Sequence, residues 1–143
     1  DARCLDVFAG SGAFGFEALS RGAAHVCFIE KHGGLCDALH EHAAMLDAQS
    51  RVTVWHQAAS PEWTPREGPF DVVFLDPPYR KALLLPMLDA LATSGALAED
   101  AVVYVEFEKE WDLKDALQGR PWLCLKHKQT RSLAYALLAF NVA

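Results

Sequence analysis

An acid, two prolines and a tyrosine follow one another in the segment "FLDPPYR", where Asp76 ends an apolar run. Proline has no N–H and holds the preceding residue in an extended conformation, so Pro77 and Pro78 must stiffen this backbone. The loop offers two fixed acceptors, the Asp76 carboxylate and the Pro77 carbonyl, and Tyr79 offers a ring face for a planar base. Two acceptors match the two N–H donors of an exocyclic amine. The segment therefore predicts a site that orients the amine of a nucleobase.

A glycine pattern near the start of the chain predicts a second site. Gly10, Gly12 and Gly15 form a G-x-G-x-x-G pattern after an apolar segment and before a helical one, and Glu30 follows at the end of the next apolar segment. Glycines let a ligand lie against bare backbone, and an acid in the position of Glu30 accepts the hydroxyls of a ribose. The pattern predicts an adenosine-bearing ligand, and it serves NAD, FAD and S-adenosylmethionine alike.

Asp6, four residues before Gly10, favours one of these ligands. A dinucleotide brings a pyrophosphate to the helix N-terminus, where a nearby carboxylate would repel it. S-adenosylmethionine instead brings an ammonium group and a sulfonium, which a carboxylate attracts. Acids at strand ends also commonly accept backbone N–H bonds in turns, so the residue type leaves both roles open for Asp6.

Alternating strands and helices must bring the two segments together. Apolar runs predict strands over residues 3–10, 25–30, 51–56, 70–76 and 101–108. Helical spacing and glycine stops predict helices over residues 13–22, 34–48, 83–95 and 112–119, and residues 57–69 read as a loop. Residues 122–128 and 132–140 read as a closing antiparallel pair. This order predicts a doubly wound, Rossmann-like α/β fold with a mostly parallel seven-stranded sheet and an antiparallel C-terminal hairpin.

Four local features of these elements are also predicted. Leu35, Leu39, Ala43 and Leu46 have the spacing of a buried helical stripe. The strand over 70–76 reads as buried on both faces, and Pro86 is expected near the first turn of its helix. Residues 106–110 read as a strand end in solvent, with a substrate contact left open.

Composition describes a globular protein without a membrane span. The 143 residues are 52% hydrophobic and 22% charged, which predicts one domain over 1–143, and no apolar run approaches the length of a transmembrane helix. Four scattered cysteines without a C-x-x-C pattern predict reduced thiols and a cytoplasmic location. The net charge is −6, but residues 101–143 are slightly basic and carry Arg120, Lys126, Lys128 and Arg131. Charge therefore does not exclude nucleic acid as a partner.

Two other sequence features give weaker indications of a functional site. His32, Cys36 and His40 have the spacing of one helix face and could bind a metal ion, but no fourth ligand lies near them in the sequence, so no metal is predicted. Ser11 has no base in the order of a catalytic triad and is expected to cap the following helix.

The paired motifs also carry a resemblance to a known family. D-P-P-Y, with "DVFAGSGAFGFEALSRGA" upstream, resembles the class I S-adenosylmethionine-dependent amino-methyltransferases, and more narrowly the bacterial 16S rRNA guanine-N2-methyltransferase family. The similarity runs from about Ala2 to Phe140. It implies a class I methyltransferase fold and methylation of the exocyclic N2 amine of a guanine. It also implies a monomer that acts on 16S rRNA within a small-subunit ribosomal particle.

The resemblance assigns roles by residue. It places the catalytic group at Asp76, Pro77, Pro78 and Tyr79. It places the cofactor-binding group at Asp6, Ala9, Gly10, Ser11, Gly12, Glu30, Lys31, Ala58 and Asp76.

Two departures from the family pattern keep alternatives open. Many relatives have an acid where this chain has Ala58, so adenine recognition is expected from the backbone or a neighbouring residue. The basic N-terminal segment with which the family grips RNA is also expected to be missing. The alternatives are an adenine-N6 methyltransferase on DNA or RNA, suggested by D-P-P-Y alone, and an inactive cofactor-binding RNA scaffold. An NAD-dependent oxidoreductase is suggested by the bare glycine pattern.

Overall fold

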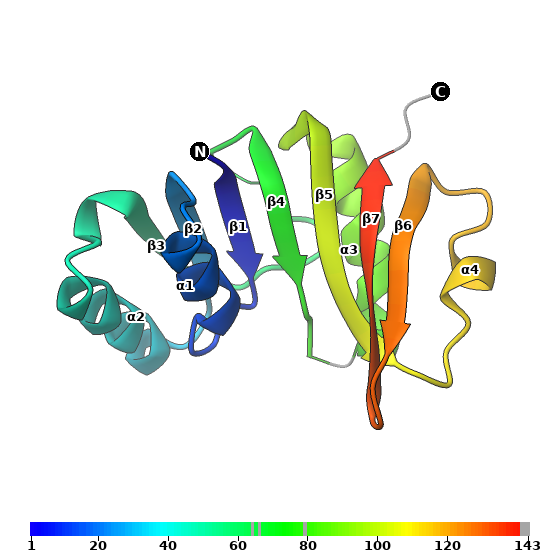
Figure 1. Ribbon diagram of the computed structural model, residues 1–143, viewed down its shortest axis with the longest axis horizontal. Helices are drawn as coiled ribbons and strands as arrows, with labels where there is room; N and C mark the ends of the chain where they lie inside the picture. Colours follow the sequence, from blue (N-terminus) through cyan, green and yellow to red (C-terminus); the bar gives the residue numbers. More distant parts are fainter. Residues whose placement is uncertain (64, 66, 79, 141–143) are drawn as a thin grey trace.

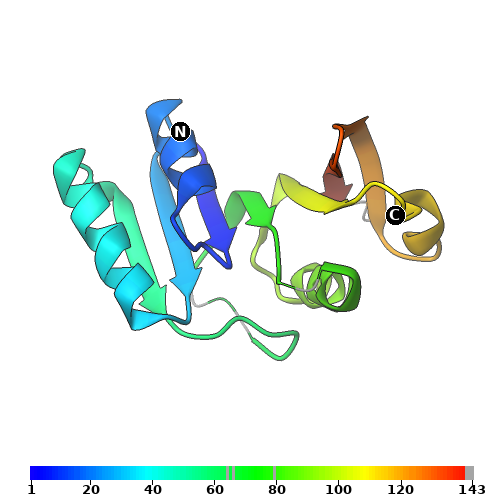
Figure 2. The same cartoon turned by 90° about the horizontal axis from the view of Figure 1, so that it is seen from below.

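The fold is a seven-stranded sheet with helices on both faces (Figures 1 and 2). The structure is a computed structural model that describes residues 1–63, 65, 67–78 and 80–140. The strands are β1 (Arg3–Val7), β2 (His25–Glu30), β3 (Val52–His56), β4 (Phe70–Leu75), β5 (Leu97–Glu108), β6 (Trp122–Gln129) and β7 (Leu133–Phe140). The helices are α1 (Ala13–Ser20), α2 (Gly33–Met45), α3 (Arg80–Thr93) and α4 (Leu113–Ala116), with a 3₁₀ turn at Gln49–Arg51.

The strand order is β3-β2-β1-β4-β5-β7-β6. Strands β1 to β5 are parallel, whereas β7 is antiparallel to both β5 and β6. The doubly wound, mostly parallel sheet with a closing antiparallel hairpin is therefore confirmed. The order reverses between β1 and β4, which is the switch point where open α/β sheets bind ligands.

Two apolar cores hold the helices against the sheet. Helix α3 covers one face with Leu84, Met87 and Leu88, which pack with Leu5 and Val105 among others. Helices α1 and α2 cover β1 to β3 on the other face, where Phe16, Phe28 and Leu39 are buried (Figure 2). Among the described residues, this second core reaches β4 only through partly buried side chains such as Phe74. The face over β4 and β5 is therefore less covered on the α1 side.

The predicted stripe on α2 is partly wrong. Cys36, Leu39 and Ala43 are its buried residues, whereas Leu35 and Leu46 are 37% and 52% exposed. Positions 36, 39 and 43 follow the 3.6-residue period as well as the predicted set does. A cysteine behaves as a small apolar residue in a core, which the sequence pattern overlooked.

Two further predictions change in the structure. Strand β4 is not buried on both faces, because Asp71 is exposed and Phe74 is half-buried. Helix α3 begins at Arg80, so Pro86 lies inside it and beyond the first turn. The proline leaves the Ala82 carbonyl without its helical donor, and Ala82 is exposed, so water can replace that donor.

None of the helices described combines the length and the apolar character that a membrane span requires.

Candidate active site

The glycine loop and the D-P-P segment meet at the switch point of the sheet. Strands β1 and β4 are adjacent and parallel, with Val7 opposite Leu75. The glycine loop follows Val7, and Asp76 follows Leu75, so both segments leave the same edge of the sheet (Figure 1). The order of the strands thus brings together two motifs that are separated by more than sixty residues in the sequence.

Glu30 ties the end of β2 to the glycine loop. Its Oε1 accepts a hydrogen bond from the Gly10 N–H at 2.8 Å, and its Oε2 accepts one from the His32 N–H at 2.9 Å. The side chain is almost fully buried. Each carboxylate oxygen has a second lone pair, so the group can still accept two hydroxyls while its position is fixed by the backbone.

The glycines of the loop have different physical roles. Gly10 has a φ of 56°, and a Cβ there would meet nothing within 4 Å. A Cβ on Gly12 would lie 2.5 Å from Leu39 Cδ2 and 2.7 Å from the Phe16 ring. Gly10 therefore borders open space where a ligand can lie, whereas Gly12 is required by the packing of α1 and α2.

Ser11 does not cap α1 as predicted. The N-cap is Gly12, in the left-handed conformation and without a side-chain cap, while Ser11 is exposed. The Gly12 N–H donates to the Ala9 carbonyl at 2.8 Å, and Ala9 is itself buried. This tight turn moves the start of the helix one residue past Ser11, so its hydroxyl is not at the capping position.

Asp6 lies beneath the loop. Its Oδ2 accepts a hydrogen bond from the Gly15 N–H at 3.1 Å, and the side chain is only 2% exposed. Burial, with smaller contributions from the charges of Asp76 and Glu30, raises the pKa of Asp6 to about 7 against the opposing Gly15 hydrogen bond. The charges of Asp76 and Glu30 therefore reach Asp6, and this concentration of acidic groups favours a cationic ligand and opposes a pyrophosphate.

A pocket of about 220 Å³ lies between the end of β2 and Pro78. It is lined by Phe8, Ile29, Glu30, Lys31, Gln57, Ala58, Ala59, Pro78 and Leu83. Glu30, Lys31 and Ala58 were expected at the cofactor and Pro78 at the substrate, and the structure places all four around one space. The pocket has apolar walls and the Glu30 carboxylate at its base, a combination that suits a nucleoside.

Sequence reasoning missed several lining residues. Phe8, which has a φ of 61°, and Leu83 of α3 line the pocket although neither is one of the residues that define the two motifs. Gln57 lies next to Ala58 and lines the same space, so it is a polar residue beside the position where the family pattern has an acid. In the sequence, only the absence of the family's acid at Ala58 could have indicated Gln57.

The D-P-P segment is only partly exposed. Asp76 is half-buried, Pro77 is buried and Pro78 is exposed. Pro77 is therefore fixed by its surroundings as well as by its ring. Tyr79, expected to stack on the target base, lies outside the described residues.

The histidine and cysteine face of α2 is not assembled as a metal site. Cys36 is buried and its thiol donates to the Glu30 carbonyl at 3.4 Å, whereas His32 and His40 are exposed. A different group, His25, Cys27 and Glu67, brings its ligand atoms within 4.8 Å of one another.

That second group is organised as a polar network. The Cys27 thiol donates to Glu67 Oε2 at 2.9 Å, and the Arg3 guanidinium lies 3.8 Å from Glu67 Oε1. Burial and the adjacent Glu67 raise the pKa of Cys27, which keeps the thiol protonated. An arginine and a protonated thiol both oppose metal binding there.

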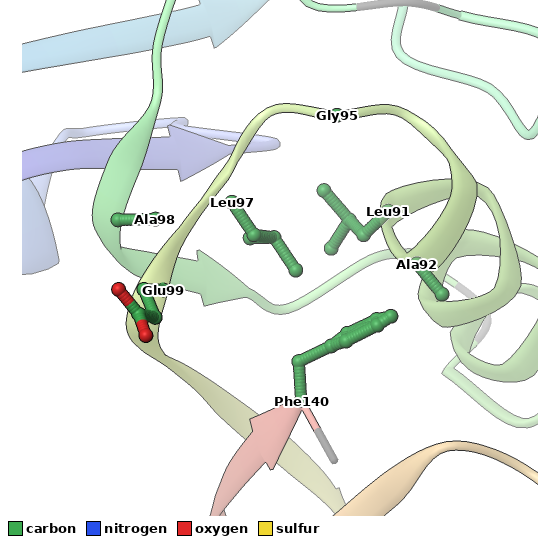
Figure 3. A pocket seen from close by; sticks show the side chains of 7 residues that line it. All are labelled: Leu91, Ala92, Gly95, Leu97, Ala98, Glu99 and Phe140. Atoms are coloured by element: carbon green, nitrogen blue, oxygen red, sulfur yellow. The ribbon is translucent and has the colours of Figure 1, made fainter. Parts of the chain in front are cut away.

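A larger pocket lies away from these motifs. It has a volume of about 440 Å³ and is formed by the end of α3, the start of β5 and the end of β7 (Figure 3). Leu91, Leu97 and Phe140 face its interior, while the Glu99 carboxylate points away from them. None of its lining residues belongs to the glycine loop or to the D-P-P segment, so its size does not make it the reaction site.

Comparisons with known proteins identify the family and the fold. The family model described as "Conserved hypothetical protein 95" matches residues 1–139. The ribosomal RNA small subunit methyltransferase D of Escherichia coli strain K12 is 39% identical over 138 residues, which cover 96% of this chain and 68% of the relative. The enzyme of the same name from Haemophilus influenzae is 37% identical over 139 residues, covering 95% of this chain and 70% of the relative.

A solved structure from Escherichia coli, 35% identical in sequence, superposes with a TM-score of 0.87 and covers all of this chain and 79% of its own. The class I methyltransferase fold that the motifs implied is thus confirmed. The chain belongs to the conserved hypothetical protein 95 family, to whose members named ribosomal RNA small subunit methyltransferase D it is similar over nearly its whole length.

Proposed function

We propose that this protein transfers a methyl group from S-adenosylmethionine to the exocyclic N2 amine of a guanine in 16S rRNA. One observation carries the proposal: the loop fixed by Glu30 and the loop stiffened by Pro77 and Pro78 leave the same edge of the sheet, where Glu30 and Pro78 line one pocket. The names of its relatives support an rRNA substrate. The free cysteines fit a cytoplasmic enzyme, and we expect it to act as a monomer on the small-subunit particle.

The residues present fit the cofactor. Gly10 leaves open space beside the loop, and the buried Glu30 carboxylate keeps lone pairs for ribose hydroxyls. Gln57 and Ala58 line the space in which an adenine would lie, and Asp6 adds negative charge for the methionine end. When bound, S-adenosylmethionine supplies an electrophilic methyl group. The same carboxylates oppose NAD, whose pyrophosphate is negatively charged.

The chain's own contribution to the reaction is positioning. Asp76 and the Pro77 carbonyl would each accept a hydrogen bond from one N–H group of the amine. This arrangement would direct the nitrogen lone pair away from the base and toward the methyl donor. Acceptors that are already fixed need no reorganisation during the reaction. The amine becomes cationic and acidic after transfer, so its proton can then leave to water, and no histidine is needed as a base. The expected stacking role of Tyr79 remains part of this proposal.

The test is methylation of 16S rRNA in naked form and in small-subunit particles, both from bacteria that lack this modification. With radiolabelled S-adenosylmethionine, we expect label in the rRNA and N2-methylguanosine in its nuclease digest. N6-methyladenosine instead would establish the adenine alternative. Cofactor binding without label in either substrate would support the inactive scaffold. Tighter calorimetric binding of NAD than of S-adenosylmethionine would favour the oxidoreductase.

A further inference from the structure

We propose that Glu106 selects guanine at this site by accepting the N1–H of the base whose 2-amine is held by Asp76 and Pro77. The inference rests on the proposed function and adds a specificity-determining residue to it. It also gives a chemical reason why a D-P-P-Y site would act on guanine and not on adenine.

Strand register places Glu106 beside Asp76. Leu75 of β4 is opposite Val105 of β5, and Asp76 and Glu106 each follow that pair directly. Adjacent strands lie about 4.8 Å apart, so the two acids occupy neighbouring positions at the edge from which the active-site loops leave. On the other side of β5, Glu106 is paired with Tyr135 of β7. Three neighbouring strands of the sheet thus place Asp76 after β4, Glu106 on β5 and Tyr135 on β7 side by side.

The side chain of Glu106 is held on the α1 side of the sheet. The Tyr104 hydroxyl donates to Glu106 Oε1 at 2.9 Å. The Tyr104 ring packs against Phe14 at the start of α1, with ring centroids 5.2 Å apart, and against Tyr135 at 5.8 Å. These rings are half-buried, as is Glu106. They form a partly exposed cluster of tilted aromatic rings beside the Glu106 carboxylate, against which a planar base could stack.

The electrostatics of Tyr104 connect this carboxylate to Asp76. Burial raises the pKa of Tyr104, the hydrogen bond and charge of Glu106 raise it further, and the charge of Asp76 also contributes. The hydroxyl therefore stays protonated and continues to donate to Glu106 across the physiological range. Since Asp76 influences the same hydroxyl, both carboxylates lie within electrostatic reach of it.

The base edge supplies the selectivity. Guanine presents N1–H and the 2-amine side by side, which are donors only, whereas the unprotonated N1 of adenine is an acceptor. A carboxylate is acceptor-only when ionised, so it pairs with the guanine N1–H and repels the adenine N1 lone pair. Sites built to hydrogen-bond a substrate N–H reject analogues that lack it by large factors, because the buried group is then left unpaired.

The test replaces the target guanine by 2-aminopurine, which keeps the 2-amine but has an unprotonated N1. The substrate is 16S rRNA assembled by ligation with either base at the methylated position, in the particle form that the enzyme accepts. For the parent enzyme we expect kcat/KM for guanine to exceed that for 2-aminopurine by on the order of 100-fold or more. Equal values in the parent would overturn the role of Glu106 while leaving the proposed function intact.

Two variants identify the residue responsible. Glu106→Gln places an amide N–H where it can donate to N1 of 2-aminopurine, so the guanine preference should fall at least tenfold. Tyr104→Phe removes the hydroxyl that positions Glu106 and should lower the preference less, with rings and fold retained. Glu110→Gln, in the exposed turn after β5, is the matched control and should keep the parental preference.

The outcomes separate the two hypotheses. An unchanged preference in both Glu106→Gln and Tyr104→Phe, with thermal unfolding like the parent, would overturn the inference. Absence of parental methylation on the guanine substrate would overturn the proposed function, and the role of Glu106 with it. A preference that falls in Glu106→Gln but not in Glu110→Gln supports the inference.

Discussion

Glu30 Oε1 accepts a hydrogen bond from the Gly10 N–H at 2.8 Å and so joins the end of β2 to the loop after β1. A buried carboxylate that holds the loop and still has lone pairs toward the pocket combines a structural role with a binding role. The relationship gives a reason why an acid at the end of the second strand accompanies a glycine loop: one side chain sets the shape of the loop and, in the proposed function, would contact its ligand.

Glu30→Ala should weaken S-adenosylmethionine binding by about 1–3 kcal/mol, because ribose hydroxyls and loop N–H groups lose their acceptor. Glu41→Ala, on the exposed side of α2, is a suitable control. Isothermal titration calorimetry measures both, and circular dichroism checks the fold. Parental affinity in a folded Glu30→Ala protein would show that the acid serves the loop alone.

Gly10 and Gly12 should respond differently to alanine. Gly12→Ala directs a methyl group into Leu39 and Phe16, so we expect a loss of about 1–3 kcal/mol of unfolding free energy from overpacking, in addition to backbone strain. Gly10→Ala meets no protein atom, so its cost in stability is limited to the backbone strain of a positive φ, and its larger effect should be on cofactor affinity. Urea denaturation and calorimetry on both variants test this division. Similar losses of unfolding free energy for both variants would contradict it.

The sequence predicted the sheet well because the strands are marked by local patterns. The predicted limits of β2, residues 25–30, agree with the structure, and the glycine stops located α1 closely. Helix α3 began earlier than expected because the residues after D-P-P carry no start signal. The stripe of α2 was misread because a cysteine, rather than Leu35 or Leu46, faces the core.

Site residues that belong to a sequence motif were predictable, whereas residues that only the tertiary fold brings to the site were not. Glu30 and Asp76 stand at strand ends that the sequence reveals, so their meeting follows from the strand order. Phe8 and Leu83 carry no such signal, because their places in the pocket depend on a loop conformation and on the packing of α3. The position of Glu106 depends on its register with Leu75 and Tyr135, which only the assembled sheet defines.

Asp6 should make stability depend on pH. Its pKa is about 7 in the folded protein against an ordinary value of 3.8, so the folded state binds more protons than the unfolded state between these values. The contribution of Asp6 to the free energy of unfolding is therefore greatest below about pH 4. It falls by a few kcal/mol in all as the pH rises toward 7. Asp6→Asn should flatten this dependence. Urea denaturation at pH 5, 6, 7 and 8 provides the measurement, and identical slopes in parent and variant would refute the assignment.

The same carboxylate should link cofactor affinity to pH. A cationic ligand favours ionised Asp6, so binding should release a proton and become tighter from pH 6 to pH 8. In Asp6→Asn the affinity should vary less over this range. Calorimetry in buffers of different ionisation enthalpy measures the proton release directly, and a proton uptake in the parent would be the opposite of the expected sign.

The β6–β7 hairpin should contribute to RNA affinity. Lys126 and Lys128 are exposed on β6, and the turn after β6 lies at the same edge as the active-site loops (Figure 1). Arg120, which the sequence placed with this group, instead pairs with Asp89 at 3.0 Å. Replacing Lys126 and Lys128 by alanine should weaken rRNA binding and reduce the slope of log K against log salt by roughly 1.5 to 2. Lys114→Ala, exposed on α4, serves as the control, and equal slopes in all proteins would exclude phosphate contacts by the hairpin.

Asp76→Ala should separate chemistry from cofactor binding. Asp76 follows Leu75 at the switch point and would accept a hydrogen bond from one N–H of the target amine, so its loss leaves the amine planar, with its lone pair conjugated with the base. By comparison with the loss of one preorganised hydrogen-bonding group, turnover should fall by about 10²–10³-fold, while S-adenosylmethionine affinity changes much less. Single-turnover methylation and calorimetry measure the two quantities on the same preparation.

Asp100→Ala, exposed in β5 and remote from the loops, should match the parent in both turnover and cofactor affinity. If Asp76→Ala lost cofactor affinity in proportion to turnover, the carboxylate would act on the cofactor, and the orientation of the amine would have to come from Pro77 and its neighbours.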